Sequence, residues 1–184
     1  MKKFLSVLVI MFSYLSVGAE LSVVMGRPYT PASKTIINHV DLSKNAQFDE
    51  SSTWIYMRLE LSGVKTTAGI YVMDDNFSTT ELLLQGLQAA AHNAPIVLTT
   101  LGPIDGIVCP MMANSPKTVF VVSAGNDSLE LKKEDLPSCT AGNILMVTDL
   151  DQENAELMPY ANHGNLVRLA APAYLLPCCK FFHE

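Results

Sequence analysis

From residue 63 onward, the chain is a succession of short apolar runs, each closed by glycine, proline or aspartate within one or two residues. The runs cover residues 68–73, 96–101, 119–123, 144–148 and 166–170. Runs of about five apolar, often β-branched residues are typical of strands that are buried on both faces of a parallel sheet. The pattern therefore predicts an α/β domain built on a parallel sheet.

One clear helix is predicted between the first two of these runs. Ser78-Thr-Thr-Glu81 has the form of a capping box, in which the serine accepts from the amide of the glutamate and the glutamate reaches back. The residues after it place apolar side chains on or near one helical face, up to about His92-Asn93. Residues 105–114 have little periodicity, which predicts a loop or a short helix.

The part before residue 63 is less regular. Residues 20–33 are predicted to be irregular because Pro28 and Pro31 punctuate them. Residues 35–40 predict a strand that ends at Asp41, and the alternation along residues 54–61 predicts a half-buried strand.

The amino end has the pattern of a secretory signal peptide, with two lysines, an apolar run and small residues up to Ala19. We expect cleavage after Ala19 and export to the periplasm or the medium. The remaining 165 residues would form one domain with a formal charge of −8. This acidic balance argues against nucleic acid or an anionic membrane as a partner.

The four cysteines are Cys109, Cys139, Cys178 and Cys179. No pair has CxxC spacing and no histidine accompanies them in a ligand pattern, so neither a zinc site nor any other cofactor is predicted. Two alternatives stay open for them, disulfides in an exported protein or buried, unpaired thiols.

The run 119–123 leads directly into Ala124-Gly-Asn-Asp-Ser128. A buried parallel strand that ends in Gly-Asn indicates a sharp turn at the carboxyl edge of the sheet. Ligands of open α/β sheets bind at that edge. We therefore predict that the carboxamide of Asn126 is a hydrogen-bond donor at a binding or catalytic site.

Five consecutive blocks resemble the carboxyl-side half of the subtilisin-like serine peptidases (peptidase S8), in the family's order. The blocks are residues 63–72, 86–102, 119–127, 136–148 and 160–172, and they include Ser-Ala-Gly-Asn126 and Leu-Ala-Ala-Pro172. The resemblance covers residues 63–173 and implies a three-layer, parallel-sheet domain that is incomplete. Residues 20–62 are then a divergent amino-terminal part and residues 174–184 an unmatched tail. The resemblance also implies that Asn126 occupies the oxyanion-hole position.

The family's catalysis needs an aspartate, a histidine and a serine in that chain order. Neither the family's "his-gly-thr" motif nor its "gly-thr-ser" motif occurs in the sequence, and no histidine lies between Asp41 and Gly63. Asp41 is the candidate for the triad aspartate, although Leu42-Ser43 follows it where the family has "ser/thr-gly". The resemblance thus implies a pseudoenzyme that does not itself hydrolyse peptides.

Several alternatives stay open at this level. The chain is either a fragment without function or a non-catalytic module that keeps part of the peptide cleft and binds a peptide or protein ligand. The rival interpretation is an unrelated exported α/β binding protein, in which Gly125-Asn126 is only a turn. Because the domain lacks elements that would cover one flank of its sheet, we also expect an oligomer.

Overall fold

A computed structural model describes residues 21–25, 36–41, 67–71, 80–99, 107–151 and 153–172. Seven strands form one sheet in the order β2-β3-β1-β4-β5-β6-β7, and every neighbouring pair is parallel. The strands are β1 (Leu21–Met25), β2 (Ile36–Asp41), β3 (Thr67–Tyr71), β4 (Ile96–Thr99), β5 (Val119–Ser123), β6 (Ile144–Leu150) and β7 (Leu169–Pro172). The α/β class and the parallel sheet are confirmed.

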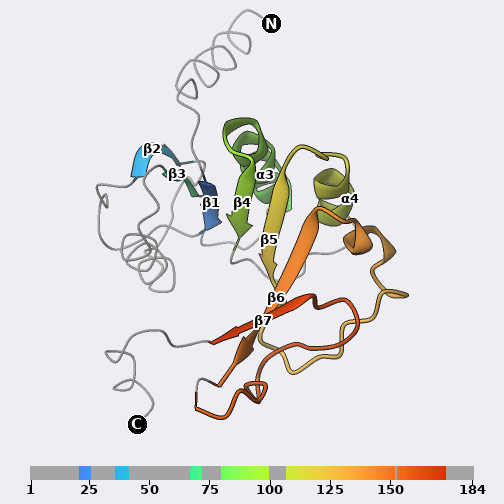
Figure 1. The fold of residues 1–184 in the computed structure, drawn as a ribbon. Helices are drawn as coiled ribbons and strands as arrows, with labels where there is room; N and C mark the ends of the chain where they lie inside the picture. Colours follow the sequence, from blue (N-terminus) through green and yellow to red (C-terminus); the bar gives the residue numbers. More distant parts are fainter. Residues whose placement is uncertain are drawn as a thin grey trace, which may run out of the picture.

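Two helices and one 3₁₀ turn accompany the sheet. They are α3 (Thr80–Asn93), α4 (Val108–Ala113) and η1 (Pro137–Thr140). Figure 1 shows α3 and α4 together on one side of β4, β5 and β6. The described residues thus form two of the three predicted layers, the sheet and one layer of helices.

The core lies between the sheet and this helical layer. Alternate residues of the strands are buried there, for example Phe120 and Val122 of β5, and they pack with Leu87 of α3 and Met112 of α4. The intervening residues face the other side and are more exposed, because strand side chains alternate between the two faces. Ile96 and Val119, which are paired in register, are 42% and 38% exposed.

The prediction that residues 20–33 are irregular is wrong at its start. Residues Leu21–Met25 form β1, which lies between β3 and β4 in the middle of the sheet. Val23 and Val24 are fully buried. The run is short because a strand in the middle of a parallel sheet needs only a few apolar residues. Pro28 and Pro31 both lie beyond its end.

The last strand is also displaced from its predicted position. The prediction covered residues 166–170, whereas β7 spans Leu169–Pro172. Leu166 is instead a loop residue that is 2% exposed and belongs to the core. Leu166 is therefore apolar because it is buried in the core, although it is not part of a strand.

The other predicted elements fall as follows. Strands β2, β3, β4, β5 and β6 and helix α3 lie within a few residues of their predicted bounds, and residues 105–114 contain the short helix α4. The signal peptide, the strand predicted at residues 54–61, Ser78 of the capping box and the tail 174–184 lie outside the described residues. Within the described ranges, no helix is long and apolar enough to cross a bilayer.

Candidate functional site at the carboxyl edge of the sheet

Strand order places the site near the point where the chain changes direction in the sheet. β1 has β3 on one side and β4 on the other, and β5 follows β4. In open α/β sheets, ligands bind beyond the carboxyl ends of the strands at such a switch point. The carboxyl end of β5 is one strand away from it, and Asn126 follows that end directly.

The turn after β5 leaves the Asn126 side chain exposed. Gly125 has φ 94°, a conformation that glycine adopts without strain. Asn126 is not among the described non-glycine residues with positive φ, which are Ser128 and Ala155. Asn126 therefore has an ordinary backbone conformation, and no hydrogen bond within the described part of the chain engages its carboxamide.

A second loop, residues 159–163, holds this turn in place. Ser128 donates from its amide to Tyr160 O (2.8 Å) and from its hydroxyl to Pro159 O (2.8 Å). These two bonds stabilise Ser128 at φ 57°, a conformation that a serine rarely adopts. The turn is therefore held by a segment that is more than thirty residues away in the sequence.

Asn162 in this second loop makes three side-chain hydrogen bonds, and it is fully buried. Its Oδ1 accepts from the amides of Asp127 (2.9 Å) and Leu129 (2.8 Å), and its Nδ2 donates to Ala124 O (2.8 Å). Asn162 is not among the site residues predicted from the sequence. The signal for it was its position in the fifth block, between Tyr160 and Gly164.

Gly164 allows the two loops to approach each other. It has φ 116°, and a Cβ built on it would collide with the carbonyl oxygen of Leu131. The amide of Leu131 donates to His163 O (2.6 Å), and the backbone amide of His163 donates to Leu129 O (2.9 Å). Any side chain at position 164 would force the loops apart.

Asp41, the candidate triad aspartate, lies at a different place on the same edge. It ends β2, and the strands β3, β1 and β4 separate β2 from β5. Four strand spacings correspond to about 19 Å between the two backbones. The structure therefore does not bring Asp41 and Asn126 together, and the role of each residue stays a prediction.

Two of the four histidines have described side-chain surroundings. His92 is exposed near the end of α3, where its Nδ1 lies 2.8 Å from Gln88 O. His163 is exposed in the loop beside Asn126, and its backbone is bonded as described above. In the described ranges, no group of three or more His, Cys, Asp and Glu side chains is arranged to hold a metal ion.

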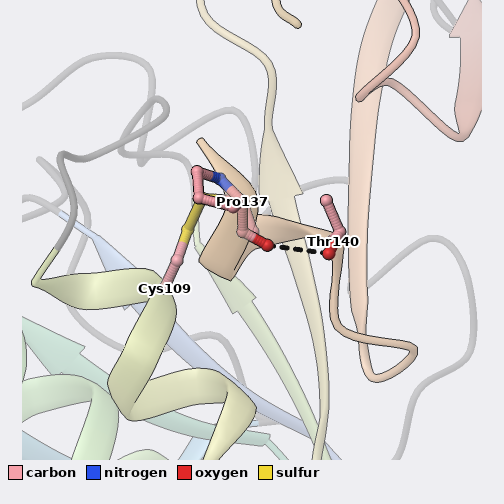
Figure 2. Close-up of a disulfide and its surroundings, with 4 residues drawn as sticks. Cys109, Pro137 and Thr140 are labelled. Carbon is pink, nitrogen blue, oxygen red and sulfur yellow. Dashed lines mark hydrogen bonds between the residues drawn. A yellow bond between two sulfur atoms is a disulfide. The ribbon is translucent and has the colours of Figure 1, made fainter. Parts of the chain in front are cut away.

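A disulfide lies on the helical side of the sheet, away from Asn126. It joins Cys109 of α4 to Cys139 of η1, with a Cα–Cα distance of 4.9 Å, and both residues are buried. Figure 2 shows the bond beside Pro137 and Thr140, whose hydroxyl donates to Pro137 O (2.7 Å). Of the two alternatives for these cysteines, the disulfide is the one found, whereas Cys178 and Cys179 lie outside the described residues.

The chain matches a protein-family model and several solved structures. A search of curated proteins finds no match. A search of solved structures finds, among others, a chain described as "PatG macrocyclase in complex with peptide", at 11% identity and a TM-score of 0.48, covering 90% of this chain and 68% of that one. The model of the subtilase family (peptidase S8) matches residues 35–180, which extends beyond the five blocks at both ends. This chain belongs to the subtilase family.

Proposed function

We propose that this chain is an exported, non-catalytic member of the subtilase family that binds extended peptide segments at the carboxyl edge of β5. One observation carries the proposal. The carboxamide of Asn126 is exposed on a turn that the loop 159–163 holds in place, while the serine and histidine motifs of the family are missing from these 184 residues.

A carboxamide in this position can bind a peptide without catalysing its hydrolysis. It carries two N–H donors, which suit the carbonyl oxygen of a peptide bond. An oxyanion donor accelerates hydrolysis only where a nucleophile creates the negative charge that it stabilises. Without serine and histidine, the same donor contributes to ground-state binding alone.

Asp41 stays the candidate for the family's first aspartate. Because it lies about four strand spacings from Asn126, we expect it to take no part in binding at β5. The variant Asp41→Asn should leave peptide affinity within about twofold of the original protein, which is less than 0.5 kcal/mol.

Export is supported by two independent features. The first nineteen residues have the pattern of a signal peptide. The Cys109–Cys139 disulfide is a kind of bond that persists in oxidising compartments and is rare in a reducing cytosol. Fusion of residues 1–25 to a reporter that is active only after export tests the proposal, and Lys2→Glu with Lys3→Glu should reduce the exported fraction.

One probe, a pool of fluorescein-labelled tryptic peptides of casein, tests both peptide binding and peptide hydrolysis. We expect saturable anisotropy change with the original protein, no cleavage of the peptides, and no labelling by a serine-directed phosphonate. Asn126→Ala should weaken binding about fivefold to tenfold, the equivalent of one hydrogen bond. The matched control is Asn114→Ala, because Asn114 is an exposed asparagine beyond the carboxyl end of α4, at the opposite edge of the sheet.

Each outcome decides one part of the proposal. Stoichiometric labelling of a serine, or cleavage of the probe, would overturn the non-catalytic assignment. Absence of any binding, or equal affinity of the original protein and Asn126→Ala, would overturn peptide binding at β5.

We further propose that the protein associates with itself through the sheet face opposite α3 and α4. Ile96 and Val119 are neighbours on this face and are both exposed, and exposed apolar surface promotes association. Light scattering should show a dimer or a larger species, and Ile96→Lys with Val119→Lys should shift it toward monomer. A monodisperse monomer of the original protein would contradict the proposal.

A further inference from the structure

The turn that carries Asn126 is fixed at both of its ends by one side chain. Nδ2 of Asn162 donates to the carbonyl oxygen of Ala124, the residue before Gly125. Oδ1 of Asn162 accepts from the amide of Asp127, the residue after Asn126. The dipeptide Gly125-Asn126 is thus enclosed between two hydrogen bonds from the same carboxamide.

The backbone of Asn162 is fixed as well. Its amide donates to Gly125 O (3.0 Å), and its carbonyl oxygen accepts from the hydroxyl of Thr148, a buried residue of β6. The side chain is fully buried, so its hydrogen bonds are shielded from water. Asn162 therefore connects the turn after β5 to the neighbouring strand β6.

This arrangement leaves Asn126 with a fixed backbone and an exposed side chain. A ligand that binds such a donor does not have to order the loop first, which lowers the entropic cost of binding. Rigid support by neighbouring buried groups is what gives a binding group a defined direction.

We infer that Asn162 is the positioning residue of the Asn126 site, a buried carboxamide that sets the conformation in which Asn126 meets its ligand. The inference rests on the proposed function in one respect, namely that Asn126 contacts the peptide. Asn162 itself is buried beneath the turn and acts through Asn126.

A double-mutant cycle on peptide affinity tests the positioning role. The probe is the same pool of labelled casein peptides, and the variants are Asn162→Ala, Asn126→Ala and the double variant. Asn162→Ala should weaken binding about tenfold when Asn126 is present and by less than twofold when Asn126 is already alanine. An equal loss in both backgrounds would show a general effect on the fold and would overturn the inference.

Amide hydrogen exchange tests the contacts without any ligand. In the original protein, the amides of Asp127 and Leu129 should be protected. Asn162→Ala should accelerate their exchange about tenfold or more, since each loses its hydrogen-bond acceptor. The matched control is Asn165→Ala, because exposed Asn165 accepts from Lys133 N (2.8 Å) and makes the same kind of bond a few residues away.

The control should accelerate exchange at Lys133 and leave Asp127 and Leu129 unchanged. Unprotected Asp127 and Leu129 amides in the original protein would overturn the inference whatever the affinity results. If the probe does not bind but the exchange pattern is as expected, the proposed function is overturned. The hydrogen bonds by which Asn162 fixes the turn are then still supported.

A further variant covers the case in which Asn162→Ala does not fold. Asn162→Asp keeps the Oδ1 acceptor for the amides of Asp127 and Leu129 and puts a carboxyl oxygen in place of the Nδ2 donor to Ala124 O. It should keep the protection of both amides and lose about threefold in affinity, a loss that disappears when Asn126 is alanine. Loss of the amide protection in Asn162→Asp would contradict the role assigned to Oδ1.

Discussion

The two ends of the β5–β6 pair are both closed by an asparagine, but in opposite ways. At the amino end, Nδ2 of Asn143 lies within hydrogen-bond distance of the carbonyl oxygens of Met112 (2.8 Å), Ser115 (3.1 Å) and Thr118 (3.1 Å). At the carboxyl end, Oδ1 of Asn162 accepts from two backbone amides. Asn143 thus donates to three carbonyl oxygens, whereas Asn162 accepts from two amides and donates to one carbonyl oxygen, that of Ala124.

The difference follows from which backbone groups need hydrogen-bond partners at each end. Met112 lies in the last turn of α4, Ser115 and Thr118 lie between α4 and β5, and Asn143 supplies a donor to the carbonyl group of each. The turn after β5 leaves amides without partners, and Asn162 supplies the acceptor. The amino end is also joined covalently nearby through Cys109–Cys139, whereas no disulfide joins the described residues of the carboxyl end.

One end of the sheet therefore closes the fold, and the other presents the exposed carboxamide of Asn126. Changes at the amino end should cost stability and leave the Asn126 site intact. Changes at the carboxyl end should alter the site, and only some of them should cost stability.

The largest expected effect is at the amino end. Replacing Cys109 and Cys139 together by alanine opens a loop of sequence separation 30. Loop-closure entropy predicts a loss of about 3–4 kcal/mol in the free energy of unfolding. Denaturant titration measures it, and peptide affinity under native conditions should stay within about twofold. A loss below about 1 kcal/mol would show that the non-covalent contacts suffice at this end.

A smaller loss is expected from Gly164→Ala at the carboxyl end. The new Cβ would clash with the backbone of Leu131, and alanine is strained at φ 116°. We expect a loss of about 2–3 kcal/mol in the free energy of unfolding and a weaker binding of the peptide probe. Gly142→Ala is the matched control, because its Cβ would meet no atom within 4 Å, and its unfolding free energy should change by less than about 0.5 kcal/mol. Equal effects of the two alanines would contradict the close approach of the loops.

Asn143→Ala should cost about 1–2 kcal/mol, since it removes a donor from partly buried carbonyls that keep some access to water. Thermal or chemical unfolding measures this loss. The amide exchange of Asp127 and Leu129 under native conditions should not change, which separates this asparagine from Asn162. Faster exchange at those two amides would show that the two ends of the sheet are coupled.

The smallest effect on stability is expected from Asn126→Ala. The residue is exposed, has no positive φ and contributes no described hydrogen bond from its side chain, so the free energy of unfolding should change by less than about 0.5 kcal/mol. The same variant should lose peptide affinity. A stability loss of about 1 kcal/mol or more in a denaturant comparison would mean that Asn126 holds the turn and is not a free donor.

The sequence predicted the elements whose signal is local. The apolar residues of β5 gave its bounds, and Gly-Asn after it predicted the turn and the exposed carboxamide. At β1 the apolar run was too short to predict a strand. Its five residues precede two prolines and nevertheless form a strand in the middle of the sheet. At Leu166 the apolar signal was present, but the residue belongs to the core outside any strand.

The sequence by itself therefore determined the parallel α/β class, the family and the position of Asn126 along the chain, because periodicity and motifs are properties of neighbouring residues. Only the tertiary structure decided the strand order, the pairing of Cys109 with Cys139, the separation of Asp41 from Asn126 and the contacts of Asn162. Each of these joins segments that are tens of residues apart. Which segments meet is decided by how the strands share one sheet and bury one core, and no local pattern records that choice.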